Sequence, residues 1–216
     1  MWLGPFPALA ANPPAPFPPV SIVPLAPATS SDSRFAELRQ AAPGLNPHAL
    51  QAALAALHNL QQAGAHVRSD ILGIIDYSLP STARRFWVLD LRSGRVLFQE
   101  LVAHGKNSGE NFATRFSNGA GSLMSSLGVF VTANPYMGEH GLSLRLQGVD
   151  KGINDNCLKR EIVIHAANYV NESLAQKLGR IGRSWGCPAV RPQISTPLIH
   201  SLEGGAVLLA WYPGRL

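Results

Sequence analysis

The sequence predicts a mainly β fold, with antiparallel sheets and short helices, preceded by a pair of N-terminal helices. From Val67 onward, short apolar or alternating runs are separated by Gly, Asn and Ser turns, as is typical of antiparallel strands. Between Ser33 and Gly64, Leu and Ala side chains recur instead at the spacing of amphipathic helices. With 216 residues, 46% of them hydrophobic and 14% charged, the chain can bury the core of one domain.

Residues 1–31 carry no charge and hold nine of the seventeen prolines of the chain. Each proline removes a helical N–H donor, so we interpret this segment as a leader or linker and expect no membrane span. Residues 7–12 look like the small-residue end of a secretory signal, without the basic and long apolar parts expected before it. Either the true start lies upstream or there is no signal. A proline-rich spacer favours a protein exported to the periplasm or cell envelope.

Residues 32–66 are predicted to form two helices with a break near Pro43. The second helix is expected to be capped by Asn46 and to have Pro47 in its first turn, because both residue types favour helix N-termini. The pair is expected to pack on the domain that follows, residues 67–216.

Seven short runs in that domain are predicted strands, at residues 71–77, 86–91, 96–103, 127–132, 142–146, 162–164 and 206–211. The turn at 92–94 joins the second and third runs as a hairpin. Two helices are predicted among the later strands. One covers 171–178 and ends at Gly179, and the other covers 197–202, with Thr196 as N-cap and a proline at its first position.

The charge pattern excludes several partners. The chain has 18 Lys and Arg against 13 Asp and Glu, a formal charge of +5, but the basic residues are scattered. We therefore expect no nucleic-acid binding, which needs a clustered basic surface. His104, His140 and His165 lack the helical spacing of zinc ligands, so neither a metal nor a cofactor is expected. We expect a monomer.

Two cysteines and one histidine carry the candidate chemistry. Cys187 follows Gly186 on a predicted turn, and His165 ends the apolar run 162–164, 22 residues earlier. A neighbouring imidazole can convert a thiol into a nucleophilic thiolate. The alternative is structural, because a disulfide between Cys157 and Cys187 would close a loop of about thirty residues and stabilise the fold by about 3 to 4 kcal/mol.

The arrangement of these residues resembles that of a known enzyme family. YkuD-type L,D-transpeptidases have a histidine and a small residue, then about fourteen to seventeen residues, then Ser/Thr-His-Gly-Cys. This chain has His165-Ala166, seventeen residues, then Ser184-Trp185-Gly186-Cys187. The match runs from about Pro43 to Pro213. Within that range, five segments look like the branch of murein L,D-transpeptidase catalytic domain proteins: 102–106, 116–118, 125–128, 140–144 and 182–188.

The resemblance implies an L,D-transpeptidase-like β-rich catalytic domain over residues 67–216 that modifies peptidoglycan. Cys187 would form a thioester with the stem tetrapeptide, release D-alanine and pass the acyl group to an amine. His165 would be the general base, and the backbone amides of Gly186 and Cys187 would hold the oxyanion. Water as the acceptor would make the protein an L,D-carboxypeptidase. A Cys157–Cys187 disulfide would instead leave a non-catalytic wall-binding module.

Two departures from the family pattern affect the expected site. Trp185 replaces the histidine two positions before the cysteine, and Ala166 replaces the glycine after the first histidine. Because an indole cannot act as a base, the role of the missing histidine is absent or is supplied by His104 or His140.

The remaining candidates are polar groups around the motif. For the group that orients His165, the sequence offers a carbonyl near Ala166 or the side chains of Ser143 or Asn168. Arginine binds carboxylates in bidentate geometry, so Arg145 is a further candidate for the stem peptide. The expected substrate-binding residues are His140, Ser143, Ser184, Arg183, Trp185, Lys106 and Arg191.

Overall fold

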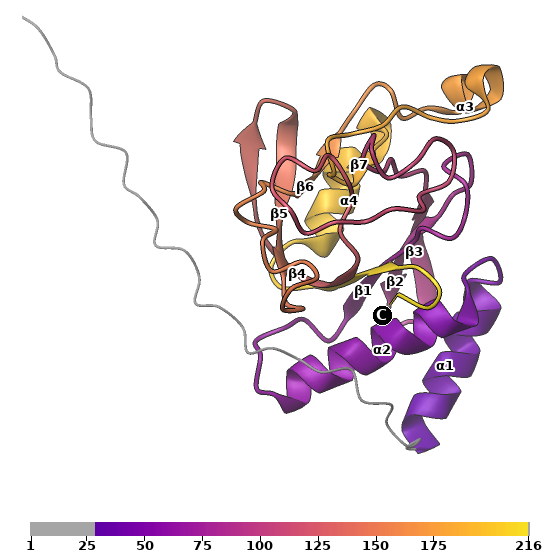
Figure 1. Ribbon diagram of the computed structural model, residues 1–216. Helices are drawn as coiled ribbons and strands as arrows, with labels where there is room; N and C mark the ends of the chain where they lie inside the picture. The colour runs from indigo at the N-terminus through magenta and orange to yellow at the C-terminus, as the bar shows by residue number, and fades with distance from the viewer. Residues whose placement is uncertain (1–28, 216) are drawn as a thin grey trace, which may run out of the picture.

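The computed structural model describes residues 29–215, with side chains from residue 33 onward, as a single eight-stranded sheet with helices on both faces (Figure 1). Residues 1–28 of the predicted leader, which was expected to cover 1–31, lie outside the described residues. Helix α1, Thr29–Ala41, is followed by α2, Pro47–Gln62. The prediction of a mainly β fold with an N-terminal helical pair is confirmed.

The strands of the sheet lie in the order β3, β2, β1, β8, β4, β5, β6, β7. Five neighbouring pairs are antiparallel, as predicted, whereas β1–β8 and β6–β7 are parallel. Parallel neighbours need a long connection, and here the rest of the domain lies between β1 and β8. The strand bounds are β1 Ile71–Asp76, β2 Phe86–Asp90, β3 Arg95–Glu100, β4 Gly128–Gly138, β5 Gly141–Gly148, β6 Val163–Ala166, β7 Ala189–Val190 and β8 Val207–Trp211.

The central strands are buried on both faces, which explains their continuous apolar runs. Along β8, Val207 and Leu209 pack in the cluster that contains the buried face of α2. Leu208 and Ala210, which alternate with them, pack in the cluster that contains α4, Pro192–Leu202. Because successive side chains of a strand point to opposite faces, one apolar strand joins two cores.

Local signals explain where two of the helices begin and end. Asn46 Oδ1 accepts a hydrogen bond from the His48 amide at 2.9 Å, which caps α2 as predicted. Helix α3, Glu172–Leu178, ends before Gly179 as predicted, and Gly179 has φ +67°. Asn171, which the sequence placed inside the helix, is its N-cap. Within residues 29–215, no helix combines the length and the apolar character needed to cross a membrane.

Helix α4 begins earlier than the sequence predicts. Pro192, and not Pro197, occupies its first turn, so Pro197 lies inside the helix and Thr196 is not the N-cap. An interior proline costs about 3 kcal/mol, so another interaction must offset it. The added turn extends a stripe of buried side chains that pack toward the sheet, namely Ser195, Leu198, Ile199 and Leu202.

The packing of α2 on the sheet is expected to contribute directly to stability. Leu50 is completely buried on this helix, whereas its neighbour Gln51 is exposed. Leu50→Ala should lower the free energy of unfolding by about 2 to 5 kcal/mol, because removal of the buried side-chain atoms leaves a cavity between α2 and the sheet. Gln51→Ala, the matched control, should change it by less than about 0.5 kcal/mol. Urea denaturation of the two variants measures both values, and equal effects would contradict this packing.

Candidate active site

The segment that carries Cys187 is held between two other parts of the chain. On one side, β7 pairs in parallel with β6, and this register sets Ala189 opposite His165. On the other side, the Ala103 amide donates to the Ala189 carbonyl oxygen at 2.9 Å, and the Ser184 amide donates to the carbonyl oxygen of His104 at 3.0 Å. Cys187 therefore lies in a segment whose two ends are hydrogen-bonded to their surroundings.

A buried arginine supports this arrangement from behind. Arg85 is completely buried, and its Nε and Nη2 donate to the Val102 carbonyl oxygen at 3.2 and 2.9 Å. Its Nη2 also donates to His104 Nδ1 at 2.7 Å, so the ring proton is on Nε2, which donates to the Gly109 carbonyl oxygen. Burial and the charge of Arg85 lower the pKa of His104 to about 4. His104 is thus a neutral structural residue and does not line the cavity described below.

The turn before the cysteine is closed by Ser184. Its hydroxyl donates to the Cys187 carbonyl oxygen at 2.6 Å and accepts from the Gly186 amide at 3.1 Å. Gly186 has φ +130°, and a Cβ there would lie 2.7 Å from the Met124 carbonyl oxygen. Glycine is required here for its conformation and for space, and its amide is already engaged.

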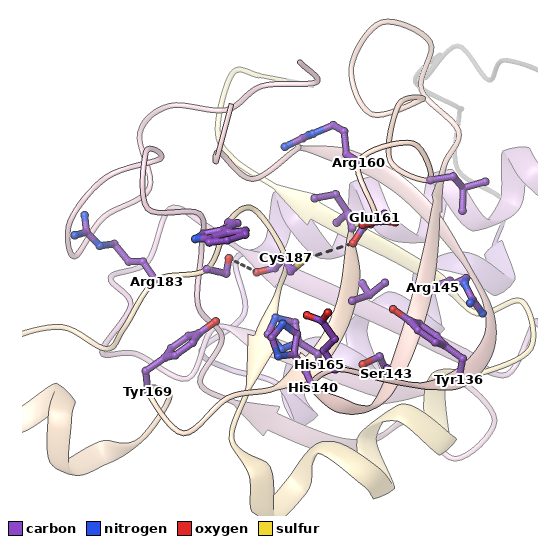
Figure 2. A pocket seen from close by; sticks show the side chains of 17 residues that line it. Tyr136, His140, Ser143, Arg145, Arg160, Glu161, His165, Tyr169, Arg183 and Cys187 are labelled. Carbon is purple, nitrogen blue, oxygen red and sulfur yellow. Dashed lines mark hydrogen bonds between the residues drawn. The ribbon is translucent and has the colours of Figure 1, made fainter. Parts of the chain in front are cut away.

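Cys187 and His165 both line a cavity of about 770 Å³ (Figure 2). Both cysteines are free thiols, and Cys157 is completely buried. The Cys187 thiol donates to the Glu161 carbonyl oxygen, with 3.7 Å between Sγ and O. Burial raises the pKa of Cys187, against the effects of a hydrogen bond from the Val163 amide and of a nearby arginine charge. The resting thiol is therefore protonated.

His165 has a fixed orientation. Its Nδ1–H donates to the Ala166 carbonyl oxygen at 2.9 Å, which leaves Nε2 able to accept a proton. The Ala166 carbonyl is thus the group that orients the ring. The other candidate, the Ser143 hydroxyl, donates instead to the carbonyl oxygen of Gly141. His140 stacks on His165 with 4.3 Å between ring centroids. Burial lowers the pKa of His165, against the opposite effect of the hydrogen bond to Ala166 and with a smaller contribution from His140, and the lowered pKa favours the neutral imidazole.

The structure brings five of the seven predicted substrate-binding residues into the cavity: His140, Ser143, Arg183, Ser184 and Trp185. Lys106 lies outside its lining, with Nζ 5.9 Å from the centre of the exposed Trp185 ring. Arg191 also lies outside, where its guanidinium pairs with Glu100 at 2.9 and 2.7 Å. Arg191 follows β7, and only the fold decides which side of the sheet edge its side chain occupies.

Several cavity residues had no signal in the sequence. Arg160 and Glu161 precede β6 and look like ordinary surface charges, yet both line the cavity. Tyr136 comes from β4. The guanidinium of Arg145, on the paired strand β5, stacks on the Tyr136 ring, with 3.8 Å from Cζ to the ring centroid. Arg145 itself, which the sequence named as a candidate for the stem peptide, lines the cavity and shares one face of β5 with Ser143.

This fold and cavity define a candidate cysteine-dependent active site. The sequence matches the family described as L,D-transpeptidase catalytic domain over residues 41–211. The chain belongs to that family. No protein with a curated description matches the sequence.

Solved structures with a similar fold include several L,D-transpeptidases. The enzyme from Mycobacterium smegmatis is 15% identical, with 66% of this chain and 59% of that chain covered and a TM-score of 0.41. The enzyme from Stackebrandtia nassauensis is 15% identical, with 84% and 78% covered and a TM-score of 0.39. L,D-transpeptidase 1 of Mycobacterium tuberculosis is 15% identical, with 65% and 60% covered and a TM-score of 0.37. The chain thus spans less than two thirds of the mycobacterial chains.

The turn at Gly186 is expected to tolerate no side chain. Gly186→Ala should lower the free energy of unfolding by about 3 kcal/mol, because the methyl group meets a backbone oxygen in a conformation that strains alanine. Gly152→Ala is the control, since Gly152 has φ +79° but open space around it. The control should cost about 1 to 2 kcal/mol from its backbone conformation alone. Chemical denaturation compares the two, and an equal cost would show that the close contact is relieved elsewhere.

The buried His104 is expected to make the fold acid-sensitive. The pKa of His104 in the folded protein, about 4, lies below the usual value for histidine. Its contribution to the free energy of unfolding is therefore complete above about pH 6.5 and is lost as the pH falls toward 4. Wild type should lose up to about 3 kcal/mol of unfolding free energy over that interval through this residue. His104→Asn should be less stable at neutral pH and show a shallower loss. Urea denaturation at several pH values measures both slopes, and parallel slopes would contradict the assignment.

Proposed function

We propose that the protein is a peptidoglycan L,D-transpeptidase in which Cys187 forms a thioester with a stem tetrapeptide. One observation carries this proposal: a free thiol shares a cavity with His165, whose Nδ1–H is bonded to a carbonyl and whose Nε2 can accept a proton. Membership of the family supports the substrate class.

The reaction has two stages, formation of the thioester and transfer of its acyl group to an amine. In each stage His165 accepts one proton and then donates it. Nε2 takes the proton from Cys187 Sγ, and the thiolate attacks the carbonyl carbon of the L-centred third residue of the stem. The tetrahedral intermediate collapses when Nε2–H protonates the leaving nitrogen, so the C–N bond breaks and D-alanine departs. An acceptor amine then attacks the thioester, His165 takes its proton and returns it to sulfur, and the thiol is restored.

The resting state must change before attack. The Cys187 thiol donates a hydrogen bond to the Glu161 carbonyl oxygen, so rotation about the Cα–Cβ bond has to turn the S–H group toward His165. The raised pKa of the thiol and the lowered pKa of the imidazole both favour the neutral pair. Substrate binding in the cavity would supply the rotation and shift this balance toward the thiolate.

The oxyanion would be held by backbone amides at the cysteine turn. The Gly186 amide already donates to Ser184 Oγ, so it would have to exchange this partner for the substrate oxygen. The Cys187 amide is the other candidate donor. Losing one such donor typically costs about 2.7 to 4 kcal/mol in the transition state.

Substrate recognition is assigned to the floor and rim of the cavity. Ser143 and Arg145 share one face of β5, opposite His165 and residue 163 of β6. Arg183 is neutralised by Glu110, whereas Arg145 forms no ion pair with an Asp or Glu side chain of residues 33–215. We assign Arg145 to a carboxylate of the stem peptide. His140 and the exposed Trp185 would contact the substrate at the rim, and the protein would act in the cell envelope, where this substrate lies.

The decisive experiment is incubation with a disaccharide tetrapeptide, with and without a second muropeptide as amine donor, followed by mass spectrometry. Cys187→Ala should reduce D-alanine release by about a thousandfold or more, because no other group in the cavity can form the thioester. Cys157→Ala is the matched control and should retain activity, because its thiol is buried outside the cavity.

The products separate the related chemistries. Cross-linked dimer supports transpeptidation, whereas tripeptide alone supports an L,D-carboxypeptidase. Equal product formation by wild type and Cys187→Ala would reject Cys187 as the nucleophile. A disulfide-locked, non-catalytic module would give no product and two unreactive cysteines in the native protein.

A further inference from the structure

Arg160 lies in the turn before β6 and is held by four hydrogen bonds to neutral oxygen atoms. Its Nη1 donates to the Ser117 carbonyl oxygen at 2.7 Å and to Ser126 Oγ at 2.5 Å. Its Nη2 donates to the Met124 carbonyl oxygen at 2.7 Å and to Ser122 Oγ at 3.2 Å. The guanidinium is therefore fixed against the loop 117–126.

The charge of this half-buried guanidinium is not neutralised. Among the side chains of residues 33–215, no Asp or Glu forms an ion pair with Arg160. Removing a cation from water without a counter-ion is costly, and burial accordingly lowers the pKa of Arg160. A cation kept in this state is suited to a partner charge that forms only during the reaction.

The thiol of Cys187 is one nearby place where such a charge can form. Arg160 Nη2 lies 3.2 Å from the position that a Cβ on Gly186 would occupy, next to Cys187 in the chain. The Cys187 thiol bonds to the carbonyl of Glu161, the residue after Arg160. Both Arg160 and Cys187 line the cavity, as Figure 2 shows.

We propose that Arg160 is a positioning residue for the nucleophile: its positive charge stabilises the Cys187 thiolate, and its hydrogen bonds hold the loop 117–126 against the cysteine turn. When the thiol proton moves to His165 Nε2, a thiolate and an imidazolium replace two neutral groups. Arg160 favours the thiolate of that pair without itself exchanging a proton. This inference rests on the proposed role of Cys187 as nucleophile.

Other charged groups near Cys187 do not replace Arg160. Arg183 is paired with Glu110, and Tyr169 stays neutral because burial raises its pKa to about 12. Cys157, on the core side, also stays protonated, since burial raises its pKa to about 12. His165 and His140 face the thiol from β6 and the β4–β5 turn.

Tyr77 and Arg145 complete the set of charged or titratable groups to be considered. Tyr77, behind the motif, stays neutral because burial raises its pKa. Arg145 is exposed and stacked on Tyr136. Glu161 acts in the opposite direction, because its carboxylate raises the pKa of Cys187.

The test measures the pH dependence of the reactivity of the Cys187 thiol and needs no peptidoglycan substrate. Iodoacetamide alkylation of Cys187 in the full chain is followed by peptide mass spectrometry between about pH 6 and about pH 11.5, and the midpoint of the rate profile reports thiolate formation. The variants are Arg160→Gln, Arg160→Lys and Glu161→Gln. Arg95→Gln is the matched control, because Arg95 is exposed on β3 and does not line the cavity.

Arg160→Gln should raise the midpoint by about one pH unit and slow alkylation near neutral pH about tenfold, because an adjacent cation lowers a thiol pKa by at least that much. Arg160→Lys keeps the charge and should recover about half of the shift or more. Glu161→Gln should lower the midpoint, and Arg95→Gln should leave it unchanged.

An unchanged midpoint in folded Arg160→Gln would overturn the inference. Equal shifts in the Gln and Lys variants would also overturn it, because they would assign the effect to the loop and not to the charge. If circular dichroism shows that Arg160→Gln does not fold, Arg160→Met, which removes the charge and keeps an apolar stem, takes its place, and an unchanged midpoint in Arg160→Met rejects the inference. Expected midpoints together with no D-alanine release by wild type would retain the role of Arg160 and reject the proposed function.

Discussion

The position of Cys187 depends on one constraint, the pairing of residues 184–190 with β6 on one side and with residues 103–106 on the other. Neither neighbour alone could hold a two-residue strand, because so few hydrogen bonds do not offset the entropy of ordering it. The buried Arg85 supports the second of these neighbours by donating to the Val102 carbonyl and to His104. The site is therefore rigid because buried polar groups behind it are fully paired.

The same burial that makes the site rigid works against its chemistry. A thiol and an imidazole taken from water both prefer their neutral forms, and the structure compensates this with a donor from the Val163 amide and the charge of Arg160. His165 keeps its acceptor nitrogen available because Nδ1–H is bonded to the chain itself. The missing family histidine is thus not replaced by another base at that position; Trp185 instead forms an exposed part of the cavity rim.

Local features of the fold were predictable because their causes lie within a few residues. The cap at Asn46 follows from a side-chain oxygen that accepts from a neighbouring amide, and the helix end at Gly179 follows from the absence of a Cβ, which permits the left-handed conformation. The parallel pairing of β1 with β8 and the early start of α4 at Pro192 were not predictable in the same way. Both depend on burial against strands far away in the sequence, which outweighs local preference.

The sequence by itself determined the order and spacing of Cys187 and His165, on which their proposed roles rest, and the glycine that directly precedes the cysteine. Only the tertiary structure decided which carbonyl orients His165, that Arg191 lies outside the cavity lining, and that Arg160 lines the same cavity as Cys187. The physical reason is the range of the interactions. Turn geometry is set by adjacent residues, whereas the electrostatic surroundings of a buried thiol are assembled from segments that meet only when the sheet forms.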